Sequence, residues 1–226
     1  MNICSYIDHT LLKPAATVAE IHKLCEEAIQ YEFAAVCIPP PFIKVAKELT
    51  LESPVKTATV IGFPFGYSAI EAKVAEIVLA IVDGADELDV VINITALKNN
   101  DWQFLGDEIN SILPIVHNRQ KIIKVIIESG ILTDEEIIKC CFLYGAAGVN
   151  YLKTSTGYAD KGASIHAVGL MKKNLPEGVK IKASGGIRTF EFAKQLIEAG
   201  ASRLGCSASV AIVNSMGRKN VSGNMY

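Results

Sequence analysis

Three charged residues interrupt otherwise apolar runs of this sequence, at places where a charged side chain is costly. Asp89 stands within ELDVVIN, Lys153 ends VNYLK, and Lys182 stands within VKIKASG. Lysine and aspartate are rarely buried without a partner, because a lone charge loses its hydration. A structural salt bridge is one explanation, but it accounts for one lysine and leaves the second unexplained. The other explanation is a catalytic site.

Two neighbouring lysines have a specific chemical use, which is the formation of a Schiff base with a carbonyl compound. The attacking lysine has to be neutral, so its pKa has to fall by about three units from ~10.4, at a cost of ~4 kcal/mol. A second ammonium group roughly 5 Å away supplies about 3 kcal/mol of this at an effective dielectric constant of ~20, and burial supplies the rest. Asp89 would keep the second lysine charged and relay a proton. Spacing alone does not decide whether Lys153 or Lys182 is the nucleophile.

Glycine-rich segments follow two of the apolar runs and suggest a site for an anion. SGGIRT (184–189) and GCSAS (205–209) each precede a predicted helix, and KTSTG ends in Gly157. Glycines let backbone N–H groups approach an anion, and a helix N-terminus adds partial positive charge. Such glycines also occur simply because they make tight turns. Since two such segments follow consecutive strands, we predict a phosphate site that includes Gly157, Gly185 and Gly186.

The elements that have to position these residues alternate along the whole chain. Short β-branched runs are followed by segments of helical period, which is typical of parallel βαβ units. The predicted strands are at 6–9, 33–38, 55–63, 86–93, 121–129, 148–155, 179–185 and 202–207, and the predicted helices at 17–30, 41–49, 68–83, 101–117, 133–145, 163–174, 189–199 and from 208. Eight units predict an α/β fold, a single-domain (β/α)8 TIM barrel over residues 1–226, with a flexible C-terminal tail at about 218–226. An open doubly wound sheet is the alternative.

Composition argues against several other classes of protein. The formal net charge is −2 and only four of the 22 basic residues are arginines, so neither nucleic acid nor an anionic membrane is expected as a partner. The first residues, MNICSYIDHT, lack the pattern of a signal peptide, and no apolar run is long enough to span a membrane, which favours a cytoplasmic location. The six cysteines lack metal-ligand spacing and are expected to be reduced thiols. We expect no metal and no other cofactor.

Several segments resemble the signature segments of the deoxyribose-phosphate aldolase family, in that family's order. These are IDHTLLKP (7–14), ELDVVIN (87–93), YLKTSTG (151–157) and IKASGGIRT (181–189), with further matches at VIGFP (60–64), TDEE (133–136) and the final Tyr226. The resemblance implies a cytosolic aldolase, often dimeric, that interconverts 2-deoxy-D-ribose 5-phosphate with glyceraldehyde 3-phosphate and acetaldehyde through a Schiff base, without a cofactor.

The resemblance also implies a role for individual residues. Lys153 becomes the Schiff-base nucleophile, Lys182 the neighbouring cation, and Asp89 the proton donor and acceptor, acting with Lys182 and a water. The implied pocket residues are Asp8, Cys37, Asn93, Thr156 and Ser207, beside the three glycines of the predicted phosphate site. A flexible tail would let the Tyr226 hydroxyl visit the site and help to move the proton at the enamine carbon; the alternative is a frayed terminus without a role.

The sequence departs from the family pattern in four places, none of which removes a predicted catalytic group. These are Thr95, the pair Ser129-Gly130, the proline-rich segment 37–42, and Ser209 in the last glycine segment. Two other functions remain open at this stage. One is a Schiff-base aldolase that acts on a phosphorylated ketose or keto acid, and the other is a catalytically silent sugar-phosphate-binding protein. A metal-dependent aldolase is disfavoured because no cluster of histidines and carboxylates is present.

Overall fold

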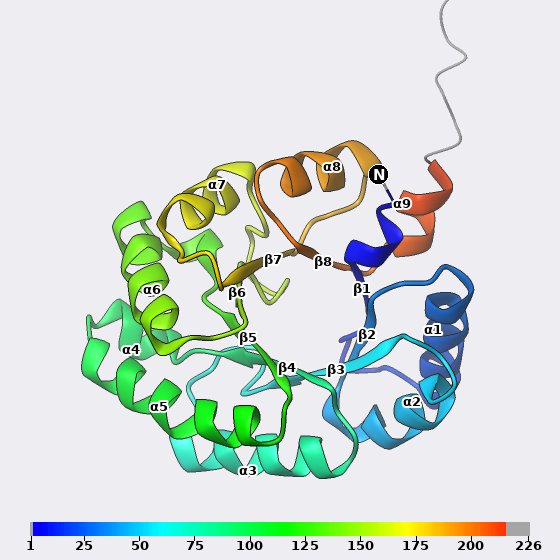
Figure 1. Cartoon of the computed structure of the whole chain (residues 1–226), viewed down its shortest axis with the longest axis horizontal. Helices are drawn as coiled ribbons and strands as arrows, with labels where there is room; N and C mark the ends of the chain where they lie inside the picture. The colour runs from blue at the N-terminus through cyan, green and yellow to red at the C-terminus, as the bar shows by residue number, and fades with distance from the viewer. Residues whose placement is uncertain (1, 216–226) are drawn as a thin grey trace, which may run out of the picture.

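Eight parallel strands close into a barrel in the computed structural model, which describes residues 2–215 (Figure 1). The strands are β1 (Ile7–Thr10), β2 (Ala35–Ile38), β3 (Lys56–Ile61), β4 (Glu87–Val91), β5 (Ile122–Ile126), β6 (Tyr151–Lys153), β7 (Lys180–Ser184) and β8 (Arg203–Cys206). Each strand pairs with the next, and β8 pairs with β1. The predicted (β/α)8 barrel is therefore confirmed, and the open sheet is wrong.

Helices surround the barrel and cover the outer side of the strands (Figure 1). They are α1 (Val18–Gln30), α2 (Ile43–Thr50), α3 (Ile70–Val82), α4 (Ile94–Lys98), α5 (Trp102–Asn118), α6 (Asp134–Ala147), α7 (Ile165–Asn174), α8 (Phe190–Glu198) and α9 (Ser209–Ser215). The predicted tail at 218–226, with Tyr226, lies outside the described residues. Among residues 2–215, no helix is both long enough and apolar enough to cross a membrane.

Six strands, β3 to β8, end earlier than the sequence predicts, and the difference matters for the site. The run that predicts a strand over 121–129 ends as a strand at Ile126, and Glu128 already has left-handed backbone angles. A short 3-10 helix, η3 (Ser129–Ile131), follows. Likewise, β4 ends at Val91, and the Asn93 side chain caps the unpredicted helix α4. Polar side chains therefore stand on short connections at the end of the barrel where strands finish.

The strand register places the charged residues side by side. Asp89 of β4 pairs with Lys124 of β5, and Lys153 of β6 pairs with Lys182 of β7, which pairs in turn with Arg203 of β8. Residues paired in register on adjacent strands point to the same side of a sheet. For these charged residues that side is the interior of the barrel. The apolar residues between them point outward and pack against the helices, as Leu88 and Val90 do in the main hydrophobic core.

Candidate active site

The three residues singled out in the sequence meet inside the barrel. Lys153 Nζ lies 2.7 Å from Asp89 Oδ2, and Lys182 Nζ lies 2.6 Å from the same oxygen. Asp89 and Lys182 are fully buried, and Lys153 is 2% exposed. The two lysine amines therefore share one carboxylate oxygen, which makes them neighbours, as predicted from their positions in the sequence.

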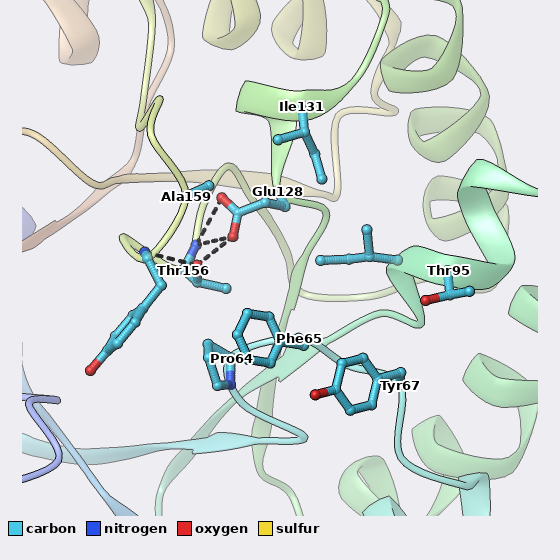
Figure 2. A pocket seen from close by; sticks show the side chains of 10 residues that line it. Pro64, Phe65, Tyr67, Thr95, Glu128, Ile131, Thr156 and Ala159 are labelled. Carbon is cyan, nitrogen blue, oxygen red and sulfur yellow. Dashed lines mark hydrogen bonds between the residues drawn. The ribbon is translucent and has the colours of Figure 1, made fainter.

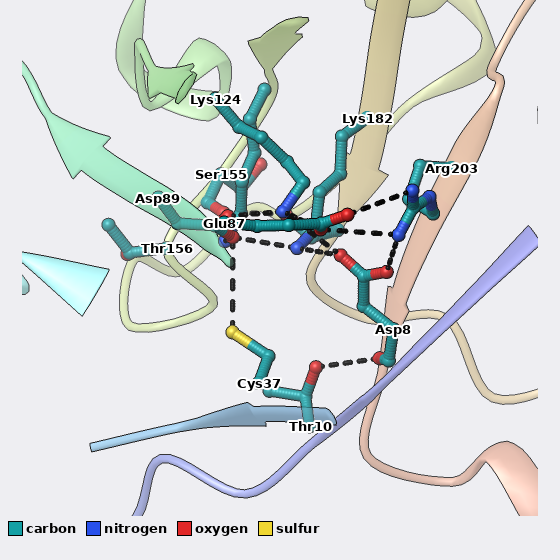
Figure 3. Close-up of polar contacts among 12 residues, drawn as sticks. Asp8, Thr10, Cys37, Glu87, Asp89, Lys124, Ser155, Thr156, Lys182 and Arg203 are labelled. Carbon is teal, nitrogen blue, oxygen red and sulfur yellow. Dashed lines mark hydrogen bonds and ion pairs between the residues drawn. The ribbon is translucent and has the colours of Figure 1, made fainter. Parts of the chain in front are cut away.

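Three further charged residues, which were not predicted from the sequence, complete a buried cluster around these contacts (Figure 3). Lys124 Nζ lies 2.5 Å from Glu87 Oε2 and 2.9 Å from Asp89 Oδ1. Arg203 contacts Glu87 at 3.2 Å and Asp8 Oδ1 at 2.6 Å. Lys124 and Glu87 carry the same signal as the predicted residues, since each is a charged residue in or beside a strand's apolar run.

The predicted pocket residues Asp8 and Cys37 also belong to this cluster (Figure 3). Asp8 Oδ2 lies 2.5 Å from Lys182 Nζ. The Cys37 thiol is fully buried and its sulfur lies 3.9 Å from Asp89 Oδ2. Burial and the charge of Asp89 raise the pKa of Cys37, so this residue is a neutral thiol beside the cluster.

The balance of charges in the cluster identifies the group that can be neutral. Four basic side chains face only three carboxylates, those of Asp8, Glu87 and Asp89. If one basic group is neutral, the cluster has no net charge, which is the less costly state for a buried group of ions. An arginine stays protonated in proteins, so the neutral group has to be a lysine.

The surroundings of the lysines select Lys153 as the neutral one. Burial lowers the pKa of Lys153 below its ordinary value and the charge of Lys182 lowers it further, while Asp89 opposes both. Burial also acts against the charge of Lys182, but Asp8 and Asp89 outweigh it and raise the pKa of Lys182. The carboxylates likewise raise the pKa of Lys124 well above its ordinary value. Lys153 is thus the amine of this cluster best suited to attack a carbonyl carbon.

A cavity of about 410 Å³, which we call the glycine cavity, lies at the end of the barrel where the strands finish. It is lined by Thr10, Leu11, Leu12, Lys13, Thr156, Gly157, Tyr158, Gly185, Gly186, Ile187, Arg188, Gly205 and Ser207. Five of the predicted site residues are among them. Gly157, Gly185 and Gly186 have φ angles of 90°, 87° and 75°, which other residues rarely adopt. At Gly185 a Cβ atom would also lie 3.0 Å from the Gly162 Cα.

A second cavity of about 320 Å³, the aromatic cavity, adjoins the first (Figure 2). It is lined by Pro64, Phe65, Tyr67, Ile94, Thr95, Glu128, Ile131, Thr156, Tyr158 and Ala159. Thr156 and Tyr158 line both cavities. The Tyr158 hydroxyl donates a hydrogen bond of 2.8 Å to the Leu12 carbonyl oxygen, so this side chain spans the mouth of the barrel between the connections after β6 and β1.

Not every residue that the sequence singled out lines these cavities. Asn93 is absent from both linings, and its side-chain oxygen accepts a hydrogen bond from the Ala96 N–H at 3.0 Å as the cap of α4. Ser209 is fully buried and its hydroxyl contacts His9 Nδ1 at 3.0 Å. This departure from the family pattern therefore serves the packing behind β8. Among residues 2–215, no group of three or more metal-ligating side chains could hold a metal ion.

Comparison with known sequences identifies the family of the chain. The family model "DeoC/LacD family aldolase" matches residues 3–223. A deoxyribose-phosphate aldolase from Caldicellulosiruptor saccharolyticus is 49% identical over 94% of this chain and 97% of its own length. The enzyme of that name from Thermococcus gammatolerans is 50% identical over 94% of this chain and 96% of its own length.

Solved structures of such enzymes share the fold over nearly the whole chain. A putative deoxyribose-phosphate aldolase from Coccidioides immitis superposes with a TM-score of 0.91 at 40% identity, covering 95% of this chain and 85% of that one. A tetrameric deoxyribose phosphate aldolase from Aeropyrum pernix gives a TM-score of 0.88 at 31% identity, with coverages of 95% and 90%. With its buried lysine cluster and its barrel, the chain is an aldolase and belongs to the deoxyribose-phosphate aldolase members of the DeoC/LacD family.

Proposed function

We propose that this protein is a Schiff-base aldolase that cleaves 2-deoxy-D-ribose 5-phosphate reversibly into D-glyceraldehyde 3-phosphate and acetaldehyde. The observation that carries the proposal is the buried Lys153 amine at the end of β6, which shares Asp89 Oδ2 with the charged Lys182 of β7. The names of the relatives point to the same substrate. No metal or organic cofactor enters the reaction, because a protonated imine is itself the electron sink.

The reaction begins at the carbonyl carbon of the open-chain sugar. The neutral Lys153 amine attacks C1 to give a carbinolamine, and loss of water gives an iminium ion. The C3 hydroxyl then loses its proton, the C3–C4 bond breaks, and the electron pair of that bond passes into the iminium to form an enamine. Glyceraldehyde 3-phosphate leaves, and the enamine is protonated and hydrolysed to acetaldehyde. Asp89 contacts the Lys153 amine directly, and Lys182 contacts the same Asp89 oxygen. Asp89 and Lys182 therefore serve the proton transfers at the Lys153 nitrogen.

The glycine cavity is the proposed site for the 5-phosphate. It combines the three positive-φ glycines with Ser207 and with the cationic side chains of Lys13 and Arg188. Backbone N–H groups that face a cavity, together with cations, favour an anion with several acceptor oxygens. Loops after the last two strands of a barrel are a common place for phosphate.

A substrate without the phosphate should therefore react far more poorly. We expect 2-deoxyribose to lose kcat as well as to gain in KM relative to its 5-phosphate, because remote binding energy positions the reacting carbons. Steady-state kinetics with both sugars measures this difference. Equal kcat/KM for the two sugars would contradict a phosphate site in the glycine cavity.

Chemical trapping tests the covalent step itself. The protein is incubated with acetaldehyde and sodium borohydride, which reduces an imine to a stable secondary amine, and the modified peptide is located by mass spectrometry. We expect one ethyl group on Lys153. Modification of Lys182 or Lys124 instead would contradict the assignment of the nucleophile, and the same treatment of the urea-unfolded chain controls for indiscriminate labelling of lysines.

A further inference from the structure

A buried histidine outside the lysine cluster contacts the segment of chain that follows β8. His9 lies on β1 and is 4% exposed. Its Nδ1 lies 3.0 Å from the Ser209 hydroxyl, and its Nε2 lies 2.9 Å from Glu27 Oε2 on α1. The ring also packs edge-on against Phe33, with 5.3 Å between the ring centroids. A buried ring with a partner at each nitrogen is held in one orientation.

The surroundings of His9 also define the positions of its protons. Burial lowers the pKa of His9, while the hydrogen bond and the charge of Glu27 oppose this shift. The ring is therefore neutral above pH 7, with one donor and one acceptor nitrogen. The Glu27 carboxylate can only accept, so Nε2 donates to it and Nδ1 accepts from the Ser209 hydroxyl. The Ser209 oxygen also lies 2.9 Å from the Cys206 carbonyl oxygen, so its single proton faces two acceptors.

His9 thereby anchors both ends of the short segment 206–209. Its backbone pairs with Cys206 in the ladder between β1 and β8, and its side chain holds Ser209, at which α9 begins. Cys206 and Ser209 are buried, whereas Ser207 between them is exposed and lines the glycine cavity. A residue held between two fixed neighbours has little conformational freedom left to lose when it binds a ligand.

This segment borders the lysine cluster as well as the glycine cavity. Gly205, directly before the segment, lines the cavity, and a Cβ atom added there would lie 3.3 Å from Lys182 Cε. Thr10, the residue after His9, lines the same cavity. A shift of the segment would therefore change the cavity wall on the side next to the cluster.

The order Glu27, His9, Ser209 resembles a serine nucleophile activated by a histidine base and an orienting carboxylate. Such a nucleophile has to reach a substrate. Ser209 is fully buried and is absent from the linings of both cavities. The three contacts therefore fix the position of the chain and do not form a second catalytic site.

We propose that His9 and Ser209 are positioning residues for the phosphate, because they hold Ser207 at the wall of the glycine cavity. Neither residue touches the phosphate, and both act through Ser207. Donors that are fixed before an anion arrives bind it more tightly than donors that have to be ordered on binding. The inference rests on the proposed function, in which the glycine cavity takes the 5-phosphate. It gives the departure from the family pattern at Ser209 a function beyond packing.

The variant Ser209→Ala removes the anchor and adds no bulk. We expect the dissociation constant for inorganic phosphate, measured by isothermal titration calorimetry at pH 8, to rise roughly tenfold, which is the order of a hydrogen bond to a charged group. In steady-state kinetics, kcat/KM for 2-deoxyribose 5-phosphate should fall by a similar factor. The value for 2-deoxyribose should change far less, because this sugar has no phosphate.

Two variants of His9 separate positioning from a merely structural role. The amide of asparagine ends at the δ position and can replace Nδ1 at Ser209, whereas the amide of glutamine ends at the ε position and can replace Nε2 at Glu27. Both variants lose the ring and its packing, so a merely structural role predicts equal phosphate affinities. We expect His9→Asn to retain most of the phosphate affinity and His9→Gln to lose as much as Ser209→Ala.

A matched control comes from the other end of α9. The Tyr31 hydroxyl donates a hydrogen bond of 3.2 Å to Asn214 Oδ1, which is a second contact between α9 and the end of α1. Asn214→Ala removes this contact without touching the segment 206–209, so it should leave the affinity for phosphate unchanged. Circular dichroism melts establish that each variant is folded before its affinity is compared.

The outcomes distinguish this inference from the proposed function. Wild-type phosphate affinity in folded Ser209→Ala or His9→Gln overturns the positioning role, and so do equal losses in the two His9 variants or a tenfold loss in Asn214→Ala. These results leave the proposed function intact. A wild-type chain that does not bind phosphate overturns the positioning role together with the phosphate site, and borohydride trapping on Lys153 then judges the aldolase chemistry separately.

Discussion

Lys153→Ala is expected to abolish turnover. No other side chain in the described cluster is positioned to form the iminium, since Lys182 and Lys124 are held charged by their carboxylates. The loss should reach the limit of detection, because the covalent intermediate is the route by which the C3–C4 bond breaks. Cleavage of 2-deoxyribose 5-phosphate, coupled to the detection of acetaldehyde, measures it.

A matched control comes from the neighbouring strand. Lys180 is exposed at the start of β7 and outside the buried cluster, so Lys180→Ala should leave cleavage and trapping close to the wild type. Removing Lys153 takes a neutral amine from the cluster and leaves three cations facing three carboxylates, so Lys153→Ala should fold. Residual cleavage above a few per cent in a folded Lys153→Ala protein would require another nucleophile.

Lys182→Leu is expected to move the pH–rate profile toward higher pH. The charge of Lys182 lowers the pKa of Lys153, and its removal also leaves the Asp89 carboxylate to stabilise the Lys153 ammonium alone at Oδ2. Both changes raise the pKa of Lys153, so less of the amine is neutral at pH 7. Each unit of rise lowers the neutral fraction roughly tenfold below the pKa.

The measurement is kcat/KM for cleavage between pH 6 and pH 10, with the rate of borohydride trapping as a second probe. A raised pKa of Lys153 slows the reaction at low pH, because less of the amine is neutral there, and the rate recovers as the pH increases. Lys182→Arg keeps the positive charge and should retain the position of the profile better than Lys182→Leu. An unchanged profile in the leucine variant would show that the second cation does not tune Lys153.

Much of the fold follows from patterns that the sequence displays openly. The strands are short, mostly apolar and evenly spaced.

The side-chain pairs Thr17–Glu20 and Thr133–Glu136 each form a capping box that begins a helix. A lysine or an aspartate inside a short apolar strand needs a partner for its charge, which points to a cluster of charged residues in the barrel. Lys124 carries the same signal as Lys182, so its place in the cluster was predictable from the same reasoning.

Other parts of the site could not be predicted in this way. Glu128 follows the run KVII without a break, so the apolar pattern extends the strand over it, and its left-handed backbone depends on contacts with Thr156, 28 residues further along. The hydrogen bond from Tyr158 to Leu12 spans 146 residues and joins two connections between elements. Neither sequence indicates that the two connections are in contact. Such contacts are set by the register of the closed barrel, which local periodicity does not encode.

The pairing of β8 with β1 has a consequence for how the protein acquires its reactivity. Asp8, which holds Lys182, lies on the first strand, and their contact spans 174 residues. In the unfolded chain Lys153 is hydrated and its amine is protonated at neutral pH, near the ordinary pKa of ~10.4. An aldehyde then reacts with it no faster than with a surface lysine. The rate at which an aldehyde labels Lys153 therefore reports the fraction of chains in which the closed barrel, with β8 paired to β1, has formed.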